Sequence, residues 1–228
     1  MGAIDFGIPR PLATMLKSKL GLANFVETGT FKGDTAAWAA REFVRVWTVE
    51  ADPALAQTAQ ARFAGQPNVT VLAGESVSAL AALVPTLPGP ALFWLDAHWC
   101  GTDQTETAGA LDQCPLLREL AVIAQSLHEH VILVDDARYF LAPPPSPNRP
   151  EQWPDAAATV AALLGGREDR YVGVVDDVFF RVPMALKGEM QAYIDRLTAH
   201  REARARKRDA KPLRRLKRFL KGLGATRS

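Results

Sequence analysis

FVETGTFKGDT, residues 25–35, joins an apolar run to an alanine-rich segment. The pattern predicts a strand, a tight turn and a helix. Gly29 and Gly33 would let the backbone of the turn approach a ligand closely, and Glu27 at the strand end could bind a cationic or hydroxyl-rich ligand. The turn lacks the Gly-x-Gly-x-x-Gly pattern that cradles a dinucleotide pyrophosphate. An ordinary strand-to-helix turn is the alternative interpretation.

Strand and helix patterns alternate along the rest of the chain. Residues 44–50, 69–72, 91–95 and 131–134 read as further strands, and residues 171–175 and 178–182 read as a final hairpin. Helices are expected on the apolar stripe from Leu12 to Leu20, in the alanine-rich segment after the first turn, from Ser76 to about Leu83, and near residues 53–63, 116–127 and 156–164. Because parallel strands need helical crossovers, this order predicts an α/β, Rossmann-like fold. We expect a seven-stranded, mostly parallel sheet with helices on both faces and a C-terminal antiparallel hairpin.

This plan divides the chain into three segments. A helical cap would occupy residues 1–23, the α/β domain residues 24–185, and a helical basic tail residues 186–228.

Each of the first five predicted strands ends in or next to an acidic residue. These residues are Glu27, Glu50, Glu75, Asp96 and Asp135. Since the carboxyl ends of parallel strands meet at one edge of a sheet, we expect the five acids at a common ligand-binding edge. Like charges gathered there are costly unless ligands or hydrogen bonds satisfy them. Any single one of them could instead cap a helix or lie in solvent.

Six short pieces of the chain together resemble a known family. They are ETGT (27–30), GDT (33–35), FWLDAH (93–98), TAG (107–109), CPLLREL (114–120) and VDDAR (134–138). Their order and spacing are similar to bacterial class I S-adenosylmethionine-dependent methyltransferase-like proteins that often occur beside glycan-assembly enzymes. The resemblance covers roughly residues 24–182 and implies the class I methyltransferase fold. The chain departs from the family at Trp99-Cys100, where Tyr-Ser is usual.

If S-adenosylmethionine is the cofactor, acids at the strand ends can each be assigned a part of it to contact. Glu50 would accept both ribose hydroxyls, and Glu75 with Ser76 would bind the adenine edge. The turn after the first strand would hold the methionine half, with Glu27 near its ammonium group. The expected cofactor-binding set is Glu27, Thr28, Gly29, Thr30, Gly33, Thr35, Glu50, Gly74, Glu75, Ser76 and Asp96. Asp34 and Thr35 could alternatively cap the helix that follows the turn.

A second group of polar residues follows the fourth and fifth strands, and it offers two chemistries. The expected catalytic residues are Asp96, His98, Asp135, Asp136 and Arg138. Asp96, Asp135 and Asp136 could hold magnesium or manganese. In the alternative, His98 is a general base that Asp96 orients. Arg138 could bind a phosphate or carboxylate of the substrate, or pair with one of the aspartates.

The apolar runs, the N-terminus and the cysteines indicate in which compartment the protein is expected. No apolar run reaches the ~20 residues that a membrane-spanning helix needs, and the N-terminus lacks a signal-peptide pattern, so we expect a cytoplasmic protein. Cys100 and Cys114 do not form a disulfide framework. With His98 they could form a partial zinc site, but the spacing matches no common zinc pattern.

The charge is split between the body and the tail. Residues 196–228 carry 13 Lys and Arg against two acids, whereas residues 1–195 carry 14 basic and 23 acidic side chains. In the tail, leucines recur at helical spacing from Leu213 to Leu223 with basic residues between them. This pattern predicts an interfacial helix on an anionic membrane surface, at the inner membrane face. A disordered tail, a helix docked on the acidic body and a nucleic-acid contact are the alternatives.

These features predict an S-adenosylmethionine-dependent O-methyltransferase that acts on a sugar, a glycan intermediate or another hydroxylated small molecule. A nucleic-acid methyltransferase is one alternative, although the acidic body and the lack of an Asn-Pro-Pro-Tyr-like motif disfavour it. A catalytically idle, cofactor-binding partner of a glycan-assembly complex is another. The sequence leaves the oligomeric state open, a homo-oligomer included.

Overall fold

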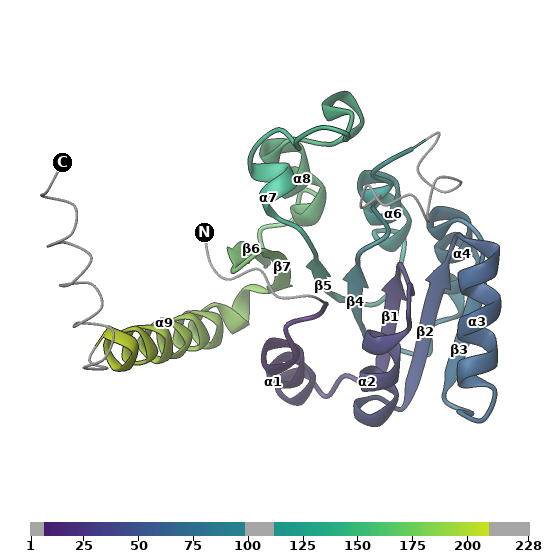
Figure 1. Cartoon of the computed structure of the whole chain (residues 1–228), viewed down its shortest axis with the longest axis horizontal. Coiled ribbons are helices and arrows are strands. Elements are labelled where there is room, and N and C mark those ends of the chain that lie inside the picture. Colours follow the sequence, from purple (N-terminus) through teal and green to yellow (C-terminus); the bar gives the residue numbers. More distant parts are fainter. Residues whose placement is uncertain (1–6, 99–111, 210–228) are drawn as a thin grey trace, which may run out of the picture. The chain divides into compact units, whose positions relative to one another are not determined.

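In the computed structural model, the described residues are 7–98 and 112–209. The chain divides into two compact units, residues 1–185 and residues 186–228. The first unit contains a sheet of seven described strands in the order β3-β2-β1-β4-β5-β7-β6 (Figure 1). The strands are β1 Asn24–Thr28, β2 Arg45–Glu50, β3 Val69–Ala73, β4 Ala91–Leu95, β5 Val131–Val134, β6 Arg170–Val175 and β7 Val178–Pro183.

Strands β1 to β5 pair in parallel, and β7 pairs antiparallel with both β5 and β6. The predicted fold class, with its closing hairpin, is therefore confirmed. The helices of the first unit are α1 Arg10–Leu20, α2 Asp34–Glu42, α3 Pro53–Phe63, α4 Ser76–Leu83, α6 Leu116–Ile123, α7 Arg138–Leu141 and α8 Ala156–Leu164. Short 3₁₀ turns lie at Val84–Thr86, Pro150–Gln152 and Met184–Leu186.

Neighbouring residues of β1 show how the sheet is covered on both faces. Phe25 packs against Trp38 and Phe43, with ring centroids 6.2 and 5.1 Å away, on the face that α2 covers. Val26 points to the opposite face, as the alternation of a strand requires, and joins a core cluster with Leu80 of α4 and residues of α6 and α8. Burial on both faces explains why β4 and β5 are continuous apolar runs.

Local chemistry fixes several helix boundaries. Asp52 begins α3 by accepting hydrogen bonds from the backbone of Ala54 and Leu55, while Pro53 takes the first helical position. The helix predicted over 116–127 ends earlier, at Ile123, because the chain continues in tight turns there, with the Ser126 N–H donating to the Ile123 carbonyl. Sequence patterns did not predict α7, since four residues are too short for a period to show.

The second unit contains α9, which spans Lys187–Asp209 and ends in a basic turn of Arg206, Lys207 and Arg208. None of the helices in residues 7–98 and 112–209 is long and apolar enough to cross a membrane. The predicted interfacial helix at Leu213–Leu223 lies outside the described residues.

Candidate functional site

The candidate site lies along the edge where β1 to β5 end, called the rim below. Parallel pairing aligns these ends, since Thr28 of β1 is level with Val49 of β2 and with Leu95 of β4. Leu95 is in turn level with Val134 of β5. The predicted residues that follow these strands therefore share one edge.

The turn after β1 is held against its neighbours on both sides. The N–H groups of Gly29 and Thr30 donate to the Val49 carbonyl at 2.9 and 3.1 Å. Gly29 has a φ of +87°, and a Cβ there would lie 2.3 Å from the Asp96 carbonyl oxygen. Gly33 has a φ of +77°, and a Cβ would lie 3.0 Å from the Phe63 ring. The two glycines thus permit close approach of β4 and α3, a reason that the ligand-based interpretation did not include.

Glu50 is fixed at the end of β2 by the backbone. One carboxylate oxygen accepts the Phe31 N–H at 2.8 Å and the other accepts the Asp52 N–H at 2.9 Å. Each oxygen can still accept one more hydrogen bond, so the carboxylate is oriented and retains capacity for two hydroxyl donors. The residue is 7% exposed. This geometry fits the predicted ribose contact.

The loop after β3 is hydrogen-bonded to the end of β2 at Glu50. The Gly74 N–H donates to the Glu50 carbonyl at 2.8 Å, and Gly74 has a φ of +129°. Ser76, the first residue of α4, is buried, whereas Glu75 is exposed. The loop therefore lies beside Glu50, as an adenine contact would require.

Glu27 is buried beneath the turn rather than on the open rim. The Thr48 hydroxyl donates to its carboxyl at 2.7 Å, and the Thr30 hydroxyl lies 2.6 Å from that of Thr48. Burial raises the pKa of Glu27 to about 8, the Thr48 and Thr35 hydroxyls oppose the rise, and the charge of Glu50 adds to it. At neutral pH Glu27 is therefore mostly an uncharged acid. Predicted capping of α2 by Asp34 or Thr35 is wrong, because Gly33 holds the cap position without a side-chain bond.

His98 and Asp136 form the closest polar pair at the ends of β4 and β5. His98 Nε2 lies 2.7 Å from Asp136 Oδ2 and 3.8 Å from Asp96 Oδ1. The carboxylate that orients the imidazole is thus Asp136, whereas the sequence analysis assigned this part to Asp96. Burial alone would raise the pKa of Asp136, but the hydrogen bond to His98 and the charges of His98 and Arg138 lower it. Asp136 is therefore ionised and accepts a hydrogen bond from an Nε2–H group of His98, so in the neutral imidazole Nδ1 is the ring nitrogen without a proton.

The pKa values of the other two aspartates, Asp135 and Asp96, are raised rather than lowered. Burial and the neighbouring charge of Asp136 raise the pKa of Asp135 to about 6. The pKa of Asp96 is raised well above its usual value by burial and by the charges of Asp135 and Asp136. The Asp96 side chain is still 31% exposed, so contact with water limits this effect.

Arg138 lies between two carboxylates. Its Nη1 is 2.6 Å from Asp136 Oδ1, and the same atom pairs with Asp177 Oδ2. Asp177 also accepts the Arg138 N–H at 2.9 Å, and its carbonyl accepts the Ala137 N–H at 2.7 Å. Arg138 therefore has the ion-pair role that the sequence analysis gave as the alternative to substrate binding. The sequence analysis read Asp177 only as part of a hairpin turn.

The aspartates do not fit a metal ion. Both oxygens of Asp136 are already engaged, one by His98 and one by Arg138, and Asp135 accepts the Asp136 N–H at 2.8 Å. Residues 7–98 and 112–209 contain no group of three or more His, Cys, Asp or Glu side chains arranged to hold a metal. The structure therefore does not support magnesium or manganese at Asp96, Asp135 and Asp136.

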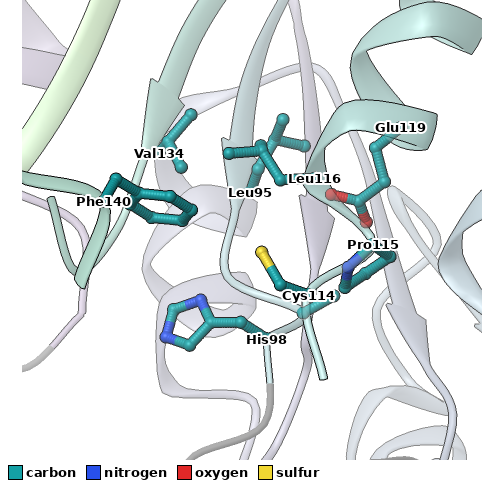
Figure 2. Close-up of a pocket in the computed structure, with 9 residues that line it drawn as sticks. Leu95, His98, Cys114, Pro115, Leu116, Glu119, Val134 and Phe140 are labelled. Atoms are coloured by element: carbon teal, nitrogen blue, oxygen red, sulfur yellow. The ribbon is translucent and has the colours of Figure 1, made fainter. Parts of the chain in front are cut away.

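A small cavity lies beside His98 (Figure 2). It has a volume of about 10 Å³, room for about one water molecule, and His98, Cys114, Glu119 and Phe140 are among its lining residues. Burial raises the pKa of the Cys114 thiol to about 12, so this thiol is not a ready nucleophile or metal ligand. Cys100, the other cysteine of the proposed zinc site, lies outside the described residues.

Two aromatic side chains, Trp153 and Tyr139, pack against the His98 imidazole. The Trp153 ring lies 5.4 Å from that of His98, and the Tyr139 ring lies 6.5 Å away, both in edge contacts. Trp153 comes from the proline-rich segment that follows α7, and Gln113 fixes this segment by accepting the Arg149 N–H at 2.7 Å. The segment thus covers one side of His98 and restricts the access of water to it.

Glu119 of α6 is a site residue that the sequence analysis missed. It is 1% exposed, and burial raises its pKa, while the Ser76 and Thr28 hydroxyls oppose the rise. In the described part of the chain, Glu119 Oε1 and Thr28 Oγ1 complete no well-formed hydrogen bond. A signal was present in the sequence, since Glu119 lies on the apolar stripe of Leu116, Leu120 and Ile123 at helical spacing.

No family model matches the chain, and no curated protein matches it. Among solved structures, a SAM-dependent methyltransferase of Aquifex aeolicus is 14% identical over 76% of this chain and 87% of that chain, with a TM-score of 0.44.

Two further structures are more similar. A proposed O-methyltransferase of Klebsiella pneumoniae is 18% identical over 78% of this chain and 82% of that chain, with a TM-score of 0.52. A proposed caffeoyl-CoA O-methyltransferase of Staphylococcus aureus is 14% identical over 80% of this chain and 86% of that chain, with a TM-score of 0.53. At these identities the likeness shows the fold, which is that of the class I methyltransferases.

Proposed function

We propose that this chain is an S-adenosylmethionine-dependent methyltransferase that acts on a hydroxyl group. The observation that carries the proposal is the His98–Asp136 pair, 2.7 Å apart, on the same rim as the oriented carboxylate of Glu50. A base and a nucleoside-binding acid on one edge of a class I methyltransferase fold are what transfer to a hydroxyl requires.

The cofactor contacts follow the geometry of the rim. Glu50 would hold the two ribose hydroxyls, the loop Gly74–Ser76 would lie along the adenine, and the turn Gly29–Gly33 would lie along the methionine part. Bound there, S-adenosylmethionine supplies an electrophilic methyl group on a sulfonium. The partly exposed carboxyl of Asp96 would favour that cation, since a positive charge nearby promotes its ionisation.

His98 would accept the proton of the acceptor hydroxyl. Asp136 fixes the Nε2–H tautomer, so Nδ1 is the atom that receives the proton as the oxygen attacks. The imidazolium that forms is stabilised by the Asp136 carboxylate, which remains ionised. The rings of Trp153 and Tyr139 limit water at the imidazole, which disfavours competing proton transfer.

The charges of the site favour an acceptor that is neutral near its reacting hydroxyl. The single positive charge of Arg138 is already balanced by the carboxylates of Asp136 and Asp177, which disfavours a phosphate or carboxylate of the substrate there. A sugar or another polyhydroxylated small molecule or glycan intermediate fits this requirement. The basic tail could bring the chain to an anionic membrane surface at the inner face, where lipid-linked glycan intermediates would be accessible.

Two measurements test the proposal. Calorimetry should show binding of S-adenosylmethionine or of its demethylated product, and Glu50→Ala should weaken binding at least tenfold because two hydroxyls lose their acceptor. Incubation with labelled S-adenosylmethionine and fractionated glycans, nucleic acids and metabolites should then identify an acceptor, with His98→Ala inactive. Tighter binding of a nicotinamide dinucleotide would overturn the cofactor. Cofactor binding without transfer to any fraction would favour the idle partner, and labelling of nucleic acid would favour the alternative acceptor.

A further inference from the structure

His98 is the first of four polar side chains, His98, Asp136, Arg138 and Asp177, that contact one another in series as far as the β6–β7 hairpin. His98 Nε2 contacts Asp136 Oδ2 at 2.7 Å, and Asp136 Oδ1 contacts Arg138 Nη1 at 2.6 Å. Arg138 Nη1 then pairs with Asp177 Oδ2. Asp177 lies in the turn between β6 and β7, so elements from three separate parts of the sequence meet in this series of contacts.

Asp177, the last of these four side chains, is fixed by hydrogen bonds to the backbone. Asp177 is 7% exposed and accepts the Arg138 N–H at 2.9 Å, while its carbonyl accepts the Ala137 N–H at 2.7 Å. These bonds connect the β6–β7 turn to the first residues of α7. The guanidinium is thereby anchored through both its own backbone and its side chain.

Asp136, by contrast, has a backbone that needs such support. Its φ is +55°, in the left-handed region that a residue with a Cβ rarely adopts. Non-glycine residues persist in this region when surrounding contacts hold them. The contact that Arg138 makes with Asp136 Oδ1 leaves Oδ2 directed at His98, and so the position of Arg138 decides where the imidazole partner lies.

We propose that Asp177 is a positioning residue for His98, acting through Arg138 and Asp136. It touches neither the imidazole nor the predicted cofactor contacts. It holds Arg138, Arg138 holds Asp136, and Asp136 holds the Nε2–H tautomer of His98. The catalytic consequence rests on the proposed function, whereas the coupling between Asp177 and the imidazole is a property of the folded chain alone.

The experiment compares Asp177→Asn with wild type by NMR of the histidine side chains. Asparagine keeps an oxygen for the Arg138 N–H but places an NH₂ group, which cannot accept, at the guanidinium, so the ion pair is lost. Imidazole nitrogen shifts report the tautomer, and the exchange rate of the Nε2 proton reports its hydrogen bond. The chain has four histidines, and His98→Ala assigns the signal of His98. We expect Nε2–H exchange to accelerate about tenfold, as the net loss of one hydrogen bond implies.

The matched control is Asp155→Asn. Asp155 also accepts a backbone N–H, that of Ala158 at 2.8 Å, but it caps α8 and contacts none of the four side chains from His98 to Asp177. Its substitution should leave the His98 signal unchanged. Equal changes in the two variants would indicate general loosening of the fold and would overturn the proposal, as would a folded Asp177→Asn protein with an unchanged signal.

A second variant guards against failure of the first to fold. Arg138→Lys leaves Asp177 and its two backbone bonds in place but replaces a planar, multi-donor group by a single ammonium. It should change the His98 signal in the same direction as Asp177→Asn. An unchanged signal in Arg138→Lys would equally overturn the proposed coupling.

Turnover distinguishes this proposal from the proposed function. Once an acceptor is known, Asp177→Asn should lower kcat about tenfold with an unchanged Kd for S-adenosylmethionine. If the NMR coupling is present but no methyl transfer occurs, the positioning role stands and the proposed function fails. If transfer occurs and Asp177→Asn leaves both the NMR signal and kcat unchanged, the function stands and the positioning role fails.

Discussion

Replacing Glu27 by Gln should make the protein more stable at high pH than wild type. The Glu27 carboxyl is fully buried, and its pKa rises from 4.5 to about 8. The group therefore binds its proton more tightly in the folded protein than in the unfolded chain. Its contribution to stability is fully present below pH 4.5 and is lost as the pH rises towards about 8.

The magnitude follows from that difference. One pKa unit corresponds to about 1.4 kcal/mol, so complete ionisation of Glu27 costs roughly 5 kcal/mol of unfolding free energy. Between about pH 5 and about pH 8.5, wild type should lose roughly 4 kcal/mol through this group. Glutamine has nearly the same shape, can accept the Thr48 hydroxyl bond, and carries no charge at any pH in this range. Glu27→Gln should lack this loss.

The assay is urea unfolding of both proteins at several pH values. Asp96 and Asp135 also titrate in this range, so the informative quantity is the difference between the two proteins at each pH, not either curve alone. That difference should grow with pH in favour of Glu27→Gln. Glu75→Gln is the control, because this exposed side chain is solvated in both states and its substitution should leave the difference near zero. Parallel pH profiles for wild type and Glu27→Gln would refute the reasoning.

Three further predictions concern the turn, the chemistry and the tail. Gly29→Ala should destabilise the fold by about 2–4 kcal/mol through left-handed strain and a clash with the Asp96 carbonyl, while Gly65→Ala, with open space around it, should be near neutral in the same unfolding assay. Methyl transfer should persist in a chelator and be abolished in His98→Ala, since His98 is the base that would accept the hydroxyl proton; loss in chelator with rescue by magnesium would contradict this. Deleting residues 211–228 should preserve cofactor binding and abolish sedimentation with anionic vesicles at low salt; a full-length chain that stays in solution would refute the membrane contact.

The sequence predicted the sheet well because its signals were local. Apolar runs marked the buried strands, an aspartate followed by proline marked the start of α3, and an acid stood at or beside the end of each parallel strand. The mostly parallel character of the sheet followed from its helix-linked connections, and the antiparallel end followed from the closing hairpin. The site edge could be predicted for the same reason, since parallel strands must end together.

The partners of the site residues could not be predicted from these patterns. Asp177 reaches Arg138 across 39 positions of sequence, and the contact depends on the pairing of β7 with β5. The burial of Glu119 was not predicted, because a single glutamate within a helical pattern is also typical of an exposed, helix-forming residue. The glycines were predicted correctly as tight-turn residues, but the protein atoms that a Cβ would meet there, which belong to Asp96 and Phe63, could not be predicted.

Asp135 and Asp136 show why a row of acids does not define a metal site. They are adjacent in sequence, yet burial raises the pKa of Asp135 to about 6, while His98 and Arg138 outweigh burial and lower the pKa of Asp136. Asp135 is therefore protonated for part of the physiological range, whereas the lowered pKa of Asp136 favours its anion, and both oxygens of Asp136 are in contact with a partner. A divalent ion would have to displace His98 and Arg138 from Asp136 to bind there, at the cost of two charge-assisted contacts. The arrangement instead suits a base whose imidazolium form needs a fixed negative partner, and it makes Asp136 the residue on which the proposed chemistry depends.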